Sequence, residues 1–264
     1  MAKKILMCPP DFFDIEYDIN VWMHEANQVS AEVAHQQWQK LHDIYTKQLG
    51  WQVELITPVK GLPDMVFATD CCTIIDSKVL LSNFRYPQRQ PETAQFEKWF
   101  RDHDYTNIKK AENFFEGGDT IVFGDKIITG HGFRSTAEAH KELQDYFSRE
   151  VISLKIVDPH FYHMDTSLAV LNDKTVAYYP GAIDEPSREK LRQVVPNLIE
   201  ATPEEAKGFG LNAVSYGQTI ICSNESEGLL QKYRVAGFNV ISTSILEFRK
   251  SGGGVKCLTL ELDL

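Results

Sequence analysis

The chain has 264 residues, of which 43% are hydrophobic and 24% charged, and its formal net charge is −10. This length allows a sizeable core, and the negative charge makes nucleic acid and anionic membranes poor partners. No run of about 18 apolar residues predicts a transmembrane helix, and the apolar start of the chain is too short for a signal peptide. The five cysteines form no CxxC pair, which favours a reduced, cytoplasmic protein.

A pattern of strand, polar turn and strand recurs after an expected first strand at residues 4–8. The turns Asp76-Ser-Lys, Gly124-Asp-Lys and Asn172-Asp-Lys are 48 residues apart each time. Gly, Asn and Asp tolerate the positive φ that tight hairpins need. We therefore expect β-hairpins at residues 71–82, 120–130 and 167–179, and a fourth at 213–222.

Segments with apolar residues at helical spacing lie between these hairpins, and each is followed by another strand pattern. Helices are expected at residues 29–49, 93–100, 135–147, 187–195 and 225–236. The strands after them are expected at residues 51–56, 105–109, 150–156, 197–201 and 238–242. The unit of hairpin, helix and strand is complete four times.

A fifth unit can form from residues 257–264 together with the N-terminal strand and the helix that follows it. A period of this length indicates a closed or stacked repeat architecture. Because one unit joins both chain ends, we predict a ring: a five-bladed pseudosymmetric α/β propeller, formed as a single domain over residues 1–264. A doubly wound α/β sheet is the weaker alternative.

Side chains suited to acid, base or nucleophilic chemistry recur just before these hairpins. In a ring of equivalent units such positions converge at one end of the central axis, so we expect these side chains to meet. Alone, each has an ordinary explanation in a turn, a strand cap or a packed core. Lys256 lies next to Cys257, the last of these positions, and would favour the thiolate form of that cysteine, which attacks carbon. The set comprises Asp70, Glu116, Asp119, His163, Asp165 and Cys257, which follows a glycine run at the start of an expected strand.

This combination resembles the guanidine-modifying, or pentein, superfamily, which includes arginine deiminases, dimethylarginine dimethylaminohydrolases, arginine dihydrolases and amidinotransferases. The motifs that carry the resemblance are Asp70, Glu116-Gly-Gly-Asp119, His163-x-Asp165 and the glycine-preceded Cys257, in the family's order. The resemblance implies the propeller fold, a small-molecule guanidino substrate and no metal or organic cofactor. Asp70 matches deiminases and dimethylargininases, whereas the dihydrolases carry asparagine in that segment.

The resemblance also implies roles in hydrolysing arginine or an N-methylated arginine to citrulline, with release of ammonia or methylamine. Cys257 would form a covalent thiouronium, and His163 would act as acid and then as base. Asp70, Glu116 and Asp165 would bind the guanidinium N–H groups, while Asp119 orients its neighbours. For the substrate carboxylate the candidates are Arg85 and Arg134, with Arg89 weaker, and Asn20 of a predicted lid at residues 11–23 would reach the substrate.

Three other functions stay open at this point. An amidinotransferase would use the same intermediate with an amine in place of water, and an arginine dihydrolase would hydrolyse twice and form ornithine. A non-catalytic binder of cationic amino acids is less consistent with so many filled reactive positions. Nothing completes a metal site around His160 and His163, and assembly into a homo-oligomer is left open.

Overall fold

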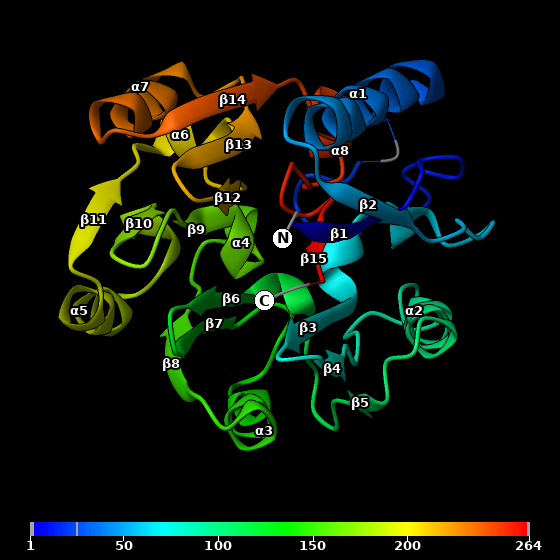
Figure 1. Ribbon diagram of the computed structural model, residues 1–264, viewed down its shortest axis with the longest axis horizontal. Helices are drawn as coiled ribbons and strands as arrows, with labels where there is room; N and C mark the ends of the chain where they lie inside the picture. Colours follow the sequence, from blue (N-terminus) through cyan, green and yellow to red (C-terminus); the bar gives the residue numbers. More distant parts are fainter. Residues whose placement is uncertain (1–2, 25, 263–264) are drawn as a thin grey trace.

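Five separate three-stranded sheets contain the strands of the computed structural model, which describes residues 3–24 and 26–262. Figure 1 shows these sheets spread around the middle of the molecule, with the longer helices at the rim. In four sheets a hairpin supplies two antiparallel strands, and the chain returns through a helix to a third, parallel strand. These sheets are β3 (Cys72–Ile75), β4 (Lys78–Leu81) and β5 (Asn107–Lys110); β6 (Thr120–Phe123), β7 (Lys126–His131) and β8 (Glu150–Lys155); β9 (Leu168–Val170), β10 (Thr175–Tyr178) and β11 (Asn197–Glu200); and β12 (Val214–Tyr216), β13 (Thr219–Ser223) and β14 (Asn239–Thr243).

The predicted hairpins are therefore confirmed, and the single sheet of the doubly wound alternative is not the arrangement found. At the first turn Asp76 and Ser77 have φ values of 51° and 61°, the left-handed conformation that tight two-residue hairpin turns require. The expectation for Cys71 is wrong, because this residue ends a short 3₁₀ helix (Ala68–Cys71) instead of starting the strand.

The fifth sheet joins the two chain ends, as predicted. Its middle strand β1 (Lys4–Met7) pairs antiparallel with β15 (Leu260–Glu261) and parallel with β2 (Gln52–Leu55). The strand expected from Cys257 is shorter than predicted, because Asn212 Oδ1 accepts the backbone N–H groups of Lys256 and Cys257 at 2.8 and 3.2 Å. These two residues therefore lie in a turn, and residues 263–264 of the expected strand lie outside the described part of the chain.

Five helices of nine or more residues lie close to the predicted positions. They are α1 (Ala31–Asp43), which continues as a π-helical segment over Ile44–Gln48, α2 (Glu92–Asp102), α3 (Ala137–Phe147), α5 (Glu185–Val194) and α7 (Glu227–Val235). Short helices that the periodicity did not predict are α4 (Met164–Ser167), α6 (Pro203–Lys207) and α8 (Leu246–Arg249), with 3₁₀ turns at Pro63–Val66, Gly117–Asp119, Pro159–Phe161 and Pro180–Ala182. Within the described residues, every helix is too short or too polar to cross a membrane.

The helices hold neighbouring sheets together through apolar contacts. Leu143 on α3 belongs to the same buried cluster as Leu80 of β4 and Ile127 of β7. One helix thus packs against strands of two consecutive sheets, and burying a side chain such as Leu143 contributes about 2 kcal/mol. The loops that lead into each hairpin are left at the centre of the arrangement, as Figure 1 shows.

The carboxylate of Glu261 connects the two chain ends, because it forms ion pairs with Lys3 and Lys256. Although burial opposes its ionisation, these two ammonium groups lower the pKa of Glu261 to about 2. A carboxyl whose folded pKa is depressed stabilises the fold above its unfolded pKa of 4.5, and this stabilisation is lost as the pH falls through the folded value.

We therefore predict that Glu261→Gln lowers the free energy of unfolding at pH 7 by about 2 kcal/mol. The difference from the wild-type protein should be constant from about pH 7 to about pH 5 and shrink as the pH falls from there to about 2. Urea denaturation across this range measures it. Glu150→Gln is the matched control, because Glu150 binds Lys126 with its side chain 57% exposed and should cost well under about 1 kcal/mol. Equal effects of the two variants at every pH would contradict the prediction.

Candidate active site

Each sheet is preceded by a short segment that directs one or two polar side chains towards the middle of the molecule. Asp70 lies in the 3₁₀ turn before β3, Asp119 in the turn before β6, and Asp165 in α4 before β9. Cys257 lies in the turn before β15. Asp70, Asp119, Asp165 and Cys257 are all at most 3% exposed. The structure thus brings together side chains separated by almost two hundred residues in sequence, as the repeat predicted.

The imidazole of His163 lies between two carboxylates. Its Nε2 atom is 2.9 Å from Glu116 Oε2, and its Nδ1 atom is 3.4 Å from Asp70 Oδ1. Burial disfavours the imidazolium, but Asp70, Glu116 and Asp119 outweigh burial and raise the pKa of His163 to about 9. Burial also opposes the ionisation of Glu116, yet Arg134 and His163 hold the pKa of this carboxyl well below its ordinary value. At neutral pH the site therefore holds an imidazolium beside carboxylates.

Asp119 holds the backbone around this imidazole. Its Oδ1 atom accepts the N–H of Met164 and its Oδ2 atom accepts the N–H of Ser135, both at 3.1 Å. The backbone next to His163 is thereby fixed, while the orienting role expected for Asp119 stays a prediction. Gly118 is required for the same approach, since a Cβ atom there would lie 2.5 Å from Asp70 Oδ1 and 2.8 Å from His163 Nδ1.

The thiol of Cys257 lies beside an amide and a carboxylate. Asn212 Nδ2 donates to Sγ at 3.1 Å, and the thiol donates to Asp165 Oδ2 at 3.5 Å. Burial, Asp165 and Asp70 raise the pKa of Cys257 well above its ordinary value. Burial and Asp70 likewise raise the pKa of Asp165 to about 7. The expectation that Lys256 favours the thiolate is wrong, because its ammonium group binds Glu261.

The three candidate arginines differ sharply in position. The side chain of Arg85 is exposed and donates to the carbonyl oxygen of Phe133 at 3.3 Å, and only its backbone N–H reaches Glu116. Arg134 is buried and donates from Nη1 to Glu116 Oε2 at 3.0 Å. Arg89, the weaker candidate, is also buried and donates from Nη1 to Asp70 Oδ2 at 2.7 Å. The structure therefore places Arg134 and Arg89 in the site and Arg85 at its edge.

The segment expected to be a lid lies against the glycine run that precedes Cys257. Asn20 donates from Nδ2 to the carbonyl oxygen of Ser251 at 3.0 Å, and its Oδ1 atom accepts the backbone N–H of Trp22 at 2.8 Å. The amide of Asn20 is thus engaged with the backbone and not directed at an open space. A cavity of about 330 Å³ lies beside this segment and is lined by residues 18–21, Tyr86, Phe133, Arg134, Pro159 and Tyr162.

Sequence reasoning missed Asn212, which binds both the thiol and the backbone of Cys257. A signal was present, because the fourth repeat begins at residue 213 and position 212 therefore corresponds to the reactive positions of the other repeats. The recurring pattern was defined by side chains that titrate, and the side chain of asparagine does not titrate. Among the described residues no cluster of three or more His, Cys, Asp or Glu side chains could hold a metal ion.

Comparison with known proteins gives one family model, described as N,N dimethylarginine dimethylhydrolase, eukaryotic, which matches residues 14–264. The dimethylarginine dimethylaminohydrolase of Mycobacterium tuberculosis is 38% identical over 99% of this chain and 86% of its own length. The bifunctional arginine dihydrolase/ornithine cyclodeaminase ArgZ of Synechocystis is 37% identical, but the chain spans only 37% of that protein.

Solved structures show the same arrangement. The N-terminal domain of ArgZ, bound to product, superimposes with a TM-score of 0.93 over 99% of this chain and 98% of that domain, at 36% identity. The Pseudomonas aeruginosa dimethylarginine dimethylaminohydrolase, as a Cys-to-Ser variant with citrulline, superimposes with a TM-score of 0.83 over 99% of both chains. Its 19% identity supports a shared fold alone.

The buried ion pairs of Arg89 generate a prediction about stability. This guanidinium also donates twice to Glu92, at 3.0 Å each, so its removal would leave Glu92 buried without its cation and Asp70 with His163 alone. Breaking such a buried pair typically costs about 3–5 kcal/mol. We expect Arg89→Ala to lower the free energy of unfolding by that amount in urea denaturation.

The matched control is Arg101→Ala. Arg101 binds Glu97 across one helical turn with its side chain 58% exposed, and such pairs contribute under about 0.5 kcal/mol. Similar losses of stability in Arg89→Ala and Arg101→Ala would contradict the structural role of Arg89.

Proposed function

Because the chain belongs to the dimethylarginine dimethylaminohydrolase family, within the guanidine-modifying (pentein) superfamily, we propose that it hydrolyses the guanidinium group of arginine or an N-methylated arginine. The reaction breaks a C–N bond and proceeds through a cysteine thiouronium, giving citrulline and ammonia or methylamine. We also infer that the five sheets are the modules of a five-bladed propeller closed by the chain ends over residues 1–264. Five free cysteines support a reducing compartment such as the cytoplasm.

One observation carries this proposal: a buried thiol and a buried imidazolium lie among four carboxylates, with acceptor atoms left over. Asp70 Oδ1 and Asp165 Oδ1 are buried and have no hydrogen-bond partner among the described residues. Buried acceptors are nearly always satisfied in a working state of a protein. A planar cation with several N–H donors fits that requirement, and guanidinium is such a group.

The same electrostatics explain how the thiol becomes reactive. Without substrate, burial and the nearby Asp165 and Asp70 keep Cys257 protonated. A guanidinium bound between these carboxylates offsets their charge, which lowers the pKa of the thiol where attack must occur. Asp165 Oδ2, no longer accepting the thiol proton, becomes an acceptor for a substrate N–H.

In the first half of the reaction, the Cys257 thiol releases its proton to solvent, the resulting thiolate forms the Sγ–C bond, and a C–N bond breaks. The leaving amine takes a proton from the imidazolium of His163, whose raised pKa keeps it charged at neutral pH. In the second half, water adds to the thiouronium carbon and gives a proton to the now neutral imidazole. The S–C bond then breaks, the proton of the added hydroxyl passes to the departing sulfur, and the ureido product and the Cys257 thiol are formed.

For the substrate carboxylate, Arg134 is better placed than Arg85. Arg134 lines the cavity beside residues 18–21, and its guanidinium lies over the rings of Tyr86 and Tyr162 at 4.8 and 4.6 Å. A guanidinium held between two rings is a rigid donor for a carboxylate. We propose that Arg134 binds it there, while contact of Asn20 and Arg85 with substrate stays a prediction.

The arginine dihydrolase function is the second candidate, because the similarity to the ArgZ domain is as extensive as that to the hydrolase of M. tuberculosis. Position 70 favours a single hydrolysis, since the dihydrolases carry asparagine in this segment and this chain carries aspartate. Amidino transfer would begin with the same thiouronium and differ only in the acceptor.

The test is incubation with L-arginine and, separately, with asymmetric dimethylarginine, while citrulline, ornithine and released amine are assayed and the intact protein is weighed by mass spectrometry. We expect citrulline from at least one substrate and no product from Cys257→Ala. Cys222→Ala is the matched control, because Cys222 is a buried free cysteine outside the site, and it should keep wild-type activity.

The other possible results of this test indicate a different reaction or none. Ornithine from the wild-type protein would establish the dihydrolase reaction, and a covalent adduct without citrulline would point to transfer and call for an assay with acceptor amines. Neither adduct nor product from either compound would reject hydrolysis of these substrates.

A further inference from the structure

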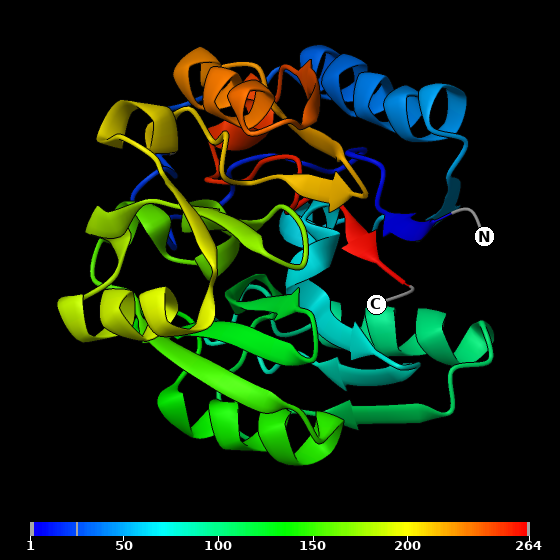
Figure 2. The ribbon, with the colours of Figure 1, turned by 60° about the vertical axis from the view of Figure 1, so that its left-hand side comes forward.

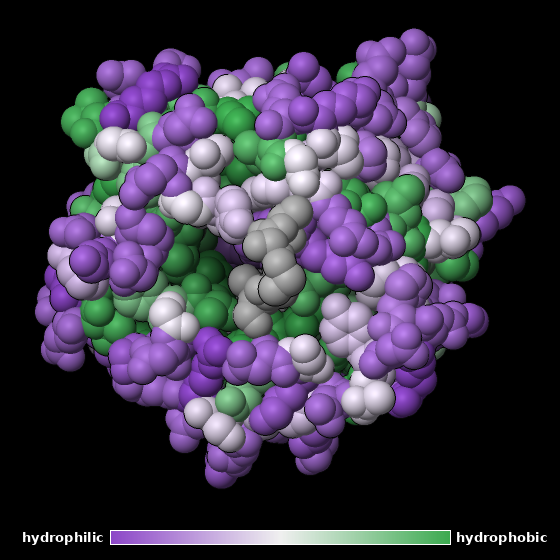
Figure 3. Space-filling view, in the orientation of Figure 1, coloured by the Kyte–Doolittle hydropathy of each residue, from purple (hydrophilic) through white to green (hydrophobic). Residues whose placement is uncertain are grey.

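A second cavity opens near the chain ends, away from the segment at residues 11–23. It encloses about 150 Å³ and is lined by residues of β6, β9, β12 and β15, from four sheets, and by Asp165 and Lys256. Figure 3, in the orientation of Figure 1, shows a hollow in the middle of the molecule. In Figure 2 the chain ends lie on one side of the molecule and the dark-blue segment after β1 lies towards the other. We call this space the rear cavity.

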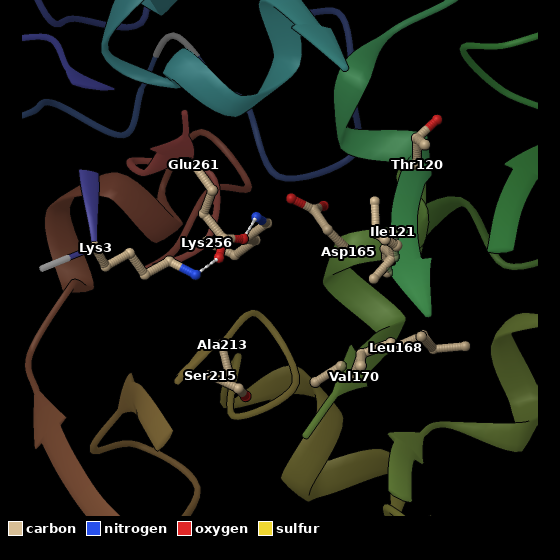
Figure 4. A pocket seen from close by; sticks show the side chains of 12 residues that line it. Lys3, Thr120, Ile121, Asp165, Leu168, Val170, Ala213, Ser215, Lys256 and Glu261 are labelled. Carbon is tan, nitrogen blue, oxygen red and sulfur yellow. Dashed lines mark hydrogen bonds and ion pairs between the residues drawn. The ribbon is translucent and has the colours of Figure 1, made fainter. Parts of the chain in front are cut away.

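The rear cavity and the cavity beside Arg134 share no lining residue. Asp165 connects the rear cavity to the chemistry, because its Oδ2 atom is 3.5 Å from Cys257 Sγ. Figure 4 shows the Asp165 carboxylate pointing into the rear cavity, towards Lys256 and Glu261. The other carboxylate oxygen, Oδ1, is buried and unpaired within the described chain. An acceptor in a polar space of this volume, which has room for several water molecules, is a site for ordered water.

The proposed reaction needs such a site. Once Cys257 carries the thiouronium, the amino-acid part of the substrate occupies the approach beside Arg134. Water must still reach the carbon bound to Sγ before the intermediate can be hydrolysed. The rear cavity reaches Asp165, whose Oδ2 atom lies 3.5 Å from Cys257 Sγ.

We propose that the rear cavity stores the hydrolytic water and that Asp165 Oδ1, once the leaving amine no longer donates to it, holds this water against the thiouronium carbon. This inference rests on the proposed function. The water oxygen forms the new C–O bond, one of its protons passes to neutral His163, and the S–C bond then breaks to release the ureido product. The lining combines the apolar side chains of Ile121, Leu168 and Val170 with the ion-paired Lys3, Lys256 and Glu261. Asp165 orients this water, because it is the lining carboxylate next to Cys257 and its Oδ1 atom has no hydrogen-bond partner among the described residues.

Filling the rear cavity tests the proposal without touching the reactive groups. Val170 is a half-buried residue of β9 that lines the cavity, and Val170→Phe would displace water from it. The matched control is Val151→Phe, because Val151 is a half-buried strand residue that lines neither cavity. Both variants are compared with the wild-type protein by steady-state kinetics on arginine or dimethylarginine and by intact-protein mass spectrometry during turnover.

We expect Val170→Phe to lower kcat about tenfold while kcat/KM stays within about twofold, because only the step after thiouronium formation is slowed. The covalent adduct should accumulate in this variant and not in Val151→Phe. Ser215→Leu, on β12 at another wall of the cavity, should act in the same direction and serves if Val170→Phe does not fold.

Wild-type kcat and no extra adduct in both folded cavity variants would overturn the proposal, because the hydrolytic water would then reach the thiouronium by another route. A parallel fall of kcat and kcat/KM without adduct would also overturn it, because the substitution would then impair the first half of the reaction. If the wild-type protein turns over neither substrate, the proposed function is rejected, and the proposed water site is rejected together with it.

Discussion

The ion-paired imidazole of His163 is the interaction on which the rest of the site depends. Two carboxylates from different sheets, Asp70 and Glu116, contact its two ring nitrogens. Charges buried this deeply are tolerated only when each has a partner of opposite sign. Arg89 and Arg134 supply further partners for the same carboxylates. The fold must therefore bring loops from several sheets to one point before any of these groups can be buried in its charged form.

The convergence follows from the closure of the sheet arrangement by the chain ends. The backbone N–H of Thr69, before β3, donates to the carbonyl oxygen of Cys257 at 3.2 Å, so the segment before β3 touches the segment before β15. Glycines permit this approach: a Cβ atom on Gly117 would lie 2.3 Å from the carbonyl oxygens of Thr69 and Cys72. The glycine pair in the Glu116 loop is thus a packing requirement of the site. The distances between the site residues and the closure of the fold by the chain ends therefore depend on the same contacts.

Much of this could be predicted from sequence because its signals are local. Hairpin turns such as Asp76-Ser77 and the 48-residue spacing of the turns identify the repeat, and the repeat predicts which positions meet. The ion-pair partner of each charged side chain could not be predicted in this way. Arg89 and Arg85 look alike in sequence, yet only Arg89 is buried against Asp70. Likewise Lys256 neighbours Cys257 along the chain, but its charge is taken by Glu261 from the fifth sheet.

The central claim is that Cys257 stays a neutral thiol until a guanidinium cation offsets the charges of Asp165 and Asp70. The most direct test is the ultraviolet thiolate absorbance of the wild-type protein minus that of Cys257→Ala, measured near neutral pH with and without guanidinium chloride at non-denaturing concentration. The account predicts no thiolate signal in the free protein and a signal that grows with guanidinium. A full thiolate signal before any cation is added would contradict it.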